Sequence, residues 1–164
     1  MGEDPVMKAH EFGERFEKDV FPHVKKFLDE NRPFVDAVTK TPERADAEHI
    51  GLLILLKTMA EHDRHADAYE RAEDRIERRD RLYWMAVKKF QIMQALRDIL
   101  KYHLNKGTPY TVDESWAKTV IDRFNALEKE YKPHYVRWLG FVVTPEERKR
   151  IKYVEDTLSK FPEL

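Results

Sequence analysis

Ile50-Gly51-Leu52-Leu53-Ile54-Leu55-Leu56 is the longest apolar run in the chain, and as a helix it has no polar side. A surface helix of a small globular protein needs only one apolar stripe, which faces the core. Nearly two helical turns that are apolar all round must be covered from more than one direction. The run therefore predicts a helix that is packed by another helix of the same chain or by a second subunit.

Length and composition point to one helical domain that spans residues 1–164. Hydrophobic residues make up 41% of the chain and charged residues 37%, and only five glycines are present, which suits tightly connected helices. The 30 basic residues nearly balance the 31 acidic ones, so the net charge of −1 gives no general attraction to nucleic acid or to an anionic membrane. The absence of cysteine excludes disulfides, thiolate metal sites and cysteine nucleophiles.

The sequence also predicts where the protein works. An apolar run of seven residues is too short to cross a membrane. The first five residues are acidic and polar, unlike a signal peptide. We therefore expect a cytoplasmic protein. Glu, Lys and Arg are abundant while Asn, Gln and Ser are scarce, a tilt typical of heat-adapted proteins, so we also expect a thermophilic source.

Apolar residues at helical spacing predict five main helices. These run from Pro5 to Arg32, from the segment after Pro42 through the apolar run toward Tyr69, from Leu82 to Asn105, from Thr111 to Trp138, and from Thr144 onward. Pro22 and Pro133 predict kinks, because proline cannot donate a backbone hydrogen bond. Short connections make the first four helices neighbours. The predicted fold is therefore an all-α, up-down-up-down four-helix bundle with an additional C-terminal helix docked outside.

Short local patterns predict the helix boundaries. Thr41 and Thr144 each precede a proline, a combination that suits a helix start. Thr111 is followed three residues later by Glu114, the spacing of a capping box. Gly107 is a typical stop signal. We therefore expect helices to begin near each of these threonines and one helix to end at residue 107.

The segment 70–81 is almost wholly charged. The pairs Asp74/Arg78 and Glu77/Arg81 have the i,i+4 spacing that supports an exposed helix. Because the segment contains neither glycine nor proline, two alternatives stay open. It forms helical extensions on both sides of a tight turn, or it continues as one long projecting helix.

Histidine is the residue type most suited to chemistry inside such a bundle, and the chain has seven. With a rise of about 1.5 Å per residue, His10, His62 and His134 fall near the same end of the predicted bundle. Three imidazole ligands suit iron or zinc and leave room for water or a small ligand. The alternative is that these histidines only make structural hydrogen bonds in or near the core.

One pair of residues resembles a ribonuclease motif. Arg97 is followed by a polar residue and, six positions later, by His103 near a helix end. This arrangement is similar to the Arg-x(4–6)-His pattern of helical ribonuclease domains of the HEPN group, and the resemblance implies RNA cleavage by these two side chains. The spacing has low specificity, because Arg44 and His49 match it too.

Association is the function that the sequence favours. The apolar residues exceed what four one-sided helices need, and exposed apolar patches mark interfaces. The expected interface consists of Leu52, Leu53, Ile54, Leu56, Trp84, Trp138 and Phe141. We therefore expect a non-catalytic helical bundle that forms a homo-oligomer or a subunit of a larger assembly. The alternatives are an iron- or zinc-binding bundle and, as a minor one, the ribonuclease; in a third, the last helix and residues 138–143 cover the apolar run within one monomer.

Overall fold

The computed structural model describes residues 4–45 and 49–160, and every regular element in these ranges is helical. The elements are α1 (Pro5–Arg15), the π-helical turn η1 (Phe16–Val20), α2 (Phe21–Glu30), α3 (Arg32–Lys40), the 3-10 turn η2 (Pro42–Arg44), α4 (Ile50–Arg71), α5 (Arg75–Lys106), α6 (Glu114–Val142) and α7 (Pro145–Lys160). The predicted all-α fold class is therefore confirmed. None of the described helices is long and apolar enough to cross a membrane.

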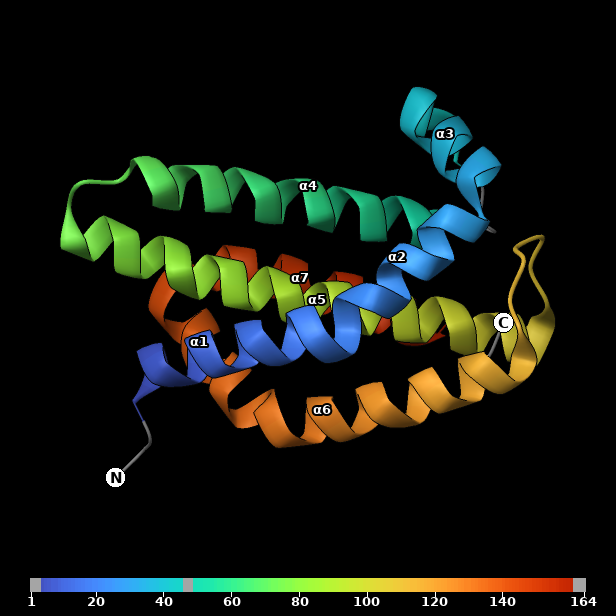
Figure 1. Cartoon of the computed structure of the whole chain (residues 1–164). Coiled ribbons are helices and arrows are strands. Elements are labelled where there is room, and N and C mark those ends of the chain that lie inside the picture. Colours follow the sequence, from blue (N-terminus) through green and yellow to red (C-terminus); the bar gives the residue numbers. More distant parts are fainter. Residues whose placement is uncertain (1–3, 46–48, 161–164) are drawn as a thin grey trace.

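The long helix α5 lies at the centre of the molecule (Figure 1). It packs against α4, α6, α1 and α7, and its residues 92–96 are all buried although they point in every direction around the helix axis. The run 50–56, in contrast, has one fully buried side, formed by Leu52 and Leu55, while Leu53, Ile54 and Leu56 are only partly buried. Among the described helices α5 is therefore the one covered from all sides, whereas the run 50–56 is covered fully on one side and partly on the others; its further cover by a second subunit stays a prediction.

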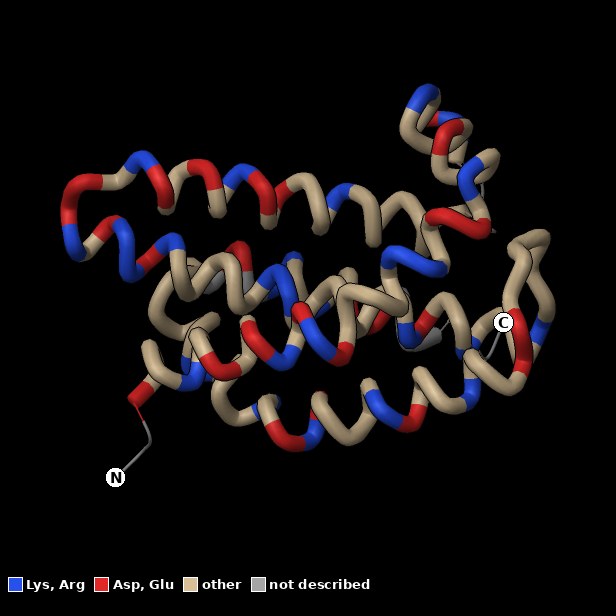
Figure 2. The backbone as a smooth tube through the Cα atoms, viewed as in Figure 1, with Lys and Arg blue, Asp and Glu red and all other residues tan. Residues whose placement is uncertain are grey.

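A tight turn joins α4 to α5, so the first of the two alternatives for residues 70–81 is correct. The Asp74 carboxylate accepts a hydrogen bond from the backbone N–H of Glu77 (2.9 Å) and caps the start of α5. The Arg78 guanidinium donates to the carbonyl oxygens of Tyr69 and Ala72 at 3.0 and 3.3 Å, and stacks over the Tyr69 ring. Arg78 therefore closes the end of α4, and basic and acidic residues alternate along both helices near this tip (Figure 2).

The predicted kink at Pro22 takes the form of a π-helical turn. The backbone N–H of Phe21 donates to the carbonyl of Phe16, five residues back. Pro22 follows directly and has no N–H to continue the usual ladder, so the hydrogen-bond register shifts in the turn before it. The first predicted helix is thereby divided into α1, η1 and α2. Pro133, in contrast, lies inside α6, which continues through it to Val142.

The other boundary predictions were partly correct. Gly107 ends α5 with a positive φ of 84°, and Thr144 and Glu147 exchange reciprocal hydrogen bonds at the start of α7. Asp113 rather than Thr111 caps α6, because its carboxylate accepts from the Trp116 N–H at 2.8 Å.

The predicted start at Thr41 was wrong. Only the 3-10 turn η2 follows Thr41, and its side-chain hydroxyl donates back to the carbonyl of Ala37 in α3. The next α-helix, α4, begins at Ile50 after His49, whose side chain makes no capping hydrogen bond.

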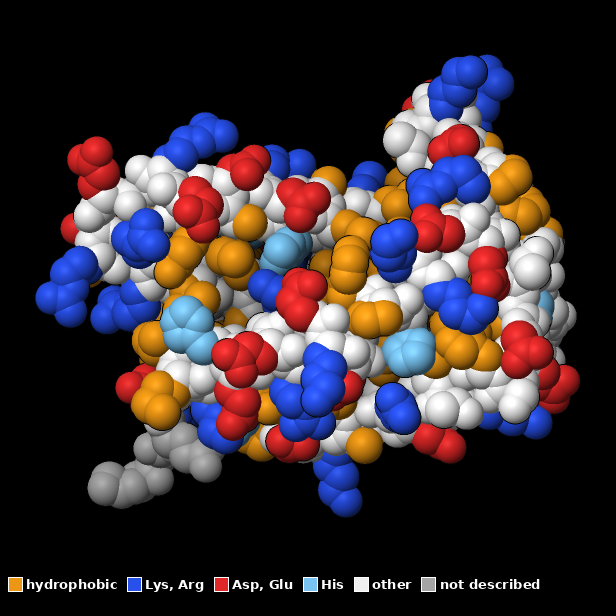
Figure 3. Space-filling view, viewed as in Figure 1, with side chains coloured by type: hydrophobic (Ala, Val, Ile, Leu, Met, Phe, Trp, Pro, Cys, Tyr) orange, Lys and Arg blue, Asp and Glu red, His pale blue; other side chains and the backbone are white. Residues whose placement is uncertain are grey.

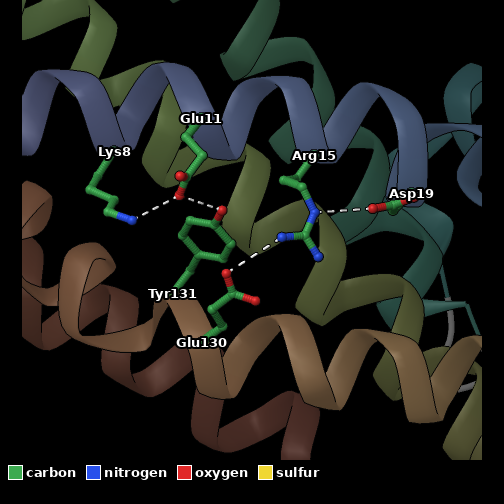
Figure 4. Close-up of polar contacts among 6 residues, drawn as sticks. All are labelled: Lys8, Glu11, Arg15, Asp19, Glu130 and Tyr131. Atoms are coloured by element: carbon green, nitrogen blue, oxygen red, sulfur yellow. Dashed lines mark hydrogen bonds and ion pairs between the residues drawn. The ribbon is translucent and has the colours of Figure 1, made fainter.

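Polar contacts join α1 to α6 along their exposed edge (Figure 4). The Tyr131 hydroxyl donates to the Glu11 carboxylate at 2.6 Å, and burial together with this carboxylate raises the pKa of Tyr131. Arg15 donates to Asp19 (3.1 Å) and to Glu130 (3.4 Å). The contacts of Glu11 with Tyr131 and of Arg15 with Glu130 hold α1 against α6.

Candidate ligand-binding cleft

A cleft of about 380 Å³ lies between α4, α5 and α7. Its wall on α5 is a row of four side chains, Trp84, Lys88, Gln91 and Gln94, whose spacing of four, three and three residues keeps them on one helix face. The opposite walls carry the apolar side chains Ile54, Ile151 and Val154. The cleft therefore has an amphipathic lining. The wall on α5 is its polar wall, and the walls on α4 and α7 mix these apolar side chains with polar and charged ones, namely Lys57, Thr58, Glu61, Glu147, Arg150 and Glu155.

Aromatic rings and neighbouring cations form one end of the cleft. The His65 ring stacks on the Trp84 indole, with centroids 5.0 Å apart and an interplanar angle of 1°. Arg81 donates to Nδ1 of His65 at 2.9 Å. Burial and the positive charge of Arg81 lower the pKa of His65 to about 4, so this ring is neutral at pH 7. It therefore presents a flat, uncharged surface beside the cleft.

Lys88 places an ammonium group in the polar wall. The residue is only 8% exposed, and burial lowers its pKa. Its Nζ lies 3.6 Å from Oε1 of Glu61, which is longer than a hydrogen-bonded ion pair. The ammonium also lies 5.5 Å from the centre of the Trp84 ring, within cation–π range. Lys88 is therefore buried with only a loose carboxylate partner.

Gln94 forms the other end of the polar wall and is 7% exposed. Its Nε2 donates to Glu128 at 3.0 Å, whereas its buried Oε1 has no hydrogen-bond partner among the described residues. Buried polar atoms without a partner are rare in folded proteins. Glu155 of α7 also lines this end. Burial raises the pKa of its carboxyl group, and a hydrogen bond from the Gln94 side chain acts in the opposite direction. This end of the cleft therefore offers an acceptor that a bound donor group would satisfy.

The residues predicted as an interface are distributed over three environments. Leu52 and Trp138 are fully buried, and the Trp138 indole N–H donates to the Pro5 carbonyl, so both belong to the core and the interface prediction was wrong for them. Ile54 and Trp84 line the cleft. Phe141 is 50% exposed, while Leu53 and Leu56 remain partly buried on α4.

The structure does not bring the three predicted metal ligands together. Nε2 of His62 accepts from Lys89 at 3.0 Å, His134 lies beside Tyr131 and Trp138 on α6, and His10 is exposed on α1. Within residues 4–45 and 49–160, no three His, Cys, Asp or Glu side chains are grouped so that they could hold a metal ion.

The predicted ribonuclease pair is held by two separate sets of partners. The Arg97 guanidinium lies 2.8 Å from Glu128 and 3.2 Å from Asp98, in a largely buried position between α5 and α6. Nδ1 of His103 lies 2.6 Å from the Thr108 hydroxyl. Both side chains thus have structural contacts that account for them.

Lys88 and Gln94 were not identified in the sequence analysis. The signal was present, because Lys88 and Gln94, together with Lys89 and Gln91, interrupt the otherwise apolar stretch 82–96 of a predicted helix. Periodicity alone assigns such residues to a solvated face, and only the position of α7 makes them a cleft wall. No protein family, curated protein or solved structure matches the chain. The function is therefore argued from the cleft itself.

Proposed function

We propose that the protein binds a small organic carboxylate with an apolar body in the cleft between α4, α5 and α7. The observation that carries this proposal is the pair Lys88 and Gln94, both more than nine-tenths buried on the same wall of the cleft. The cleft volume of about 380 Å³ lies within the range of small-molecule sites. No covalent chemistry is part of this function.

The energetic cost of the polar wall favours a ligand over a purely structural role. Burying an ammonium without a close partner is costly, and leaving a buried amide oxygen unpaired costs about 1–3 kcal/mol. Leucine or methionine at these positions would fill the same space without either cost. A bound carboxylate would satisfy Lys88, and a bound hydroxyl or amide group would satisfy Gln94.

The geometry of α5 sets the dimensions of this ligand. Lys88 and Gln94 are six residues apart, which corresponds to about 9 Å along a helix axis. Ile151 and Val154 of α7 line the same cleft. The ligand is therefore an acid with a hydrogen-bond donor roughly 9 Å from its carboxylate and an apolar segment in between.

Binding is tested with a panel of such hydroxy- and amido-carboxylic acids, by calorimetric titration of the wild type and two variants. Lys88→Met removes the ammonium and leaves Glu61 partly exposed to water, so the variant is expected to fold. We expect it to weaken binding at least tenfold, about 1.4 kcal/mol. Lys101→Met, on the same helix but outside the cleft, is the matched control. Equal affinities for all three proteins, or no binding acid in the panel, would contradict the proposal.

Two finer predictions from the sequence accompany this proposal. We propose that α1 with α2, α4, α5 and α6 constitute an up-down-up-down four-helix bundle, to which α7 is the additional helix.

Association of two copies is the second candidate function. It is favoured by Leu53 and Leu56, apolar residues that lie about one turn apart and partly exposed on α4.

A further inference from the structure

A second groove, of about 640 Å³, lies on the opposite side of α5 from the cleft wall, between α5, α1 and η1. Apolar side chains of Leu82, Met85 and Ala86 form part of its lining, and Lys89 lies among them. Figure 3 shows this face, where the surface is hollowed between α4 and α1. Lys88 and Lys89 are adjacent in sequence, but a rotation of about 100° per helical residue directs them to different pockets.

Lys89 has an unusual partner for a lysine. Its Nζ lies 3.0 Å from Nε2 of His62 on α4, and Nδ1 of His62 lies 3.2 Å from the carboxylate of Asp63. In the described part of the chain, no carboxylate lies within ion-pair distance of Lys89, whereas Lys88 has Glu61 at 3.6 Å. Lysine, imidazole and carboxylate thus form a hydrogen-bonded chain that begins in the groove.

The contacts determine how protons are placed along this chain. The Lys89 ammonium donates to Nε2 of His62, so the imidazole is neutral and its Nδ1–H donates to Asp63. Burial lowers the pKa of Lys89 and of His62, and the positive charge of Lys89 lowers the pKa of His62 further, while Glu17 of η1 and Asp63 act in the opposite direction on both groups. Among these effects burial is the largest for both groups. Lys89 therefore loses its proton more readily than an exposed lysine. It is the hydrogen bond of 3.0 Å, and not the lowered pKa of His62, that makes Nε2 of His62 the acceptor for this proton.

We propose that Lys89 is a nucleophilic amine that captures aldehydes as an imine, with His62 as its proton acceptor. Lys89 first transfers a proton from Nζ to Nε2 of His62. The free amine then attacks the carbonyl carbon, and the imidazolium returns the proton to the carbonyl oxygen to give a carbinolamine. Loss of that hydroxyl with one further proton releases water and leaves a C=N bond. No oxidant or reductant is required, since amine and aldehyde give imine and water.

The lining of the groove identifies the class of aldehyde. Leu82, Met85 and Ala86 suit a short aliphatic chain, while Glu14 and Glu17 are balanced by Lys18 and Lys89, so the lining gives no net attraction to a charged compound. The expected substrate is therefore an uncharged aliphatic aldehyde, for which propanal is a suitable probe. This selectivity separates the groove from the cleft, where Lys88 is expected to bind an acid.

The test treats the intact wild-type protein with low concentrations of propanal and cyanoborohydride, and maps the propylated lysines by peptide mass spectrometry. We expect Lys89 to be labelled at least fivefold faster than exposed Lys106 and faster than buried Lys88. His62→Asn removes the acceptor imidazole and should slow labelling at Lys89 alone. His23→Asn, which changes another partly buried histidine, is the matched control and should leave the rate unchanged.

Two outcomes would overturn the inference. One is labelling of Lys89 at the same rate as Lys106, because this would mean that Lys89 reacts as an ordinary surface amine. The other is an unchanged rate at Lys89 in the His62→Asn variant. Circular dichroism of both variants checks that the helices are retained, and the wild-type comparison of Lys89 with Lys106 holds even where a variant fails to fold.

Discussion

Lys88, Gln94 and Asp98 are polar side chains buried on α5, and their partners satisfy them to different degrees. Asp98 has Arg97 at 3.2 Å, and burial still raises the pKa of its carboxyl group. Lys88 has only the distant Glu61, and Gln94 has a partner for its amide nitrogen but none among the described residues for its oxygen. The two incompletely satisfied groups are the ones that line the cleft, which is why we assign the ligand to them.

The lowered pKa of His65 predicts that the stability of the protein depends on pH. Its pKa of about 4 in the folded state lies below the ordinary value of 6.5. The unfolded chain therefore binds more protons between these values, and the His65 contribution is complete above pH 6.5 and lost as the pH falls toward 4. Urea unfolding at several pH values should show that the free energy of unfolding falls less steeply with decreasing pH for His65→Gln than for the wild type.

His23, His62 and His103 also have lowered pKa values, and they affect the wild type and the His65→Gln variant equally. The difference in pH dependence between the two proteins therefore reports on His65 alone. If the free energy of unfolding changed with pH by the same slope in both proteins between pH 4 and 6.5, the buried environment assigned to the His65 ring would be contradicted.

Some residues with a local role could be predicted from the sequence, although Thr41 and Thr111 were not, and residues whose role depends on distant partners could not be predicted. Gly107 and Thr144 act within one helix end, so their patterns were sufficient. The contact between Lys89 and His62 joins residues 27 positions apart on two helices, and no spacing rule connects them. For the same reason the sequence suggested metal ligands from three helices that the fold does not bring together.

At the scale of elements, α5 shows why an apolar run is an incomplete indicator of burial. The run 50–56 has the higher local hydrophobicity, yet only one of its sides is fully buried. Residues 92–96 include Gln94 and are all buried, because α4, α6, α1 and α7 surround α5. Burial follows the number of neighbouring helices, which composition does not reveal.

Two glycine substitutions test the assigned helix geometry. Gly107 has φ 84° and ψ 149°, a region that only glycine adopts readily, so Gly107→Ala should reduce the free energy of unfolding by about 1–3 kcal/mol. Gly13 is helical, and a Cβ there would meet nothing within 4 Å. Gly13→Ala should therefore stabilise the protein by about 0.5–1 kcal/mol. Denaturant unfolding measures both changes, and effects of the same sign would show that one of the two conformations is assigned incorrectly.

For the whole molecule, the apolar surface predicted to drive association is reduced by the chain itself. Ile54 faces the cleft with Ile151 and Val154, and Trp138 is in the core. Of the predicted interface residues on α4, only Leu53 and Leu56 are partly exposed outside the cleft. If two copies associate through this helix, Leu53→Glu should convert a dimer into a folded monomer, because a charge there is tolerated once it faces water. Light scattering measures the mass of each protein in solution, and a monomeric wild type would contradict association.

We propose above that the cleft between α4, α5 and α7 binds an organic acid. The most direct measurement is a crystal structure of the protein with the strongest-binding acid from the titrations. We predict that its carboxylate lies within hydrogen-bond distance of Nζ of Lys88, with its donor group at Oε1 of Gln94 and its apolar segment against Ile151 and Val154. An acid bound elsewhere on the molecule, with the cleft unoccupied and Lys88 paired only with Glu61, would contradict the claim.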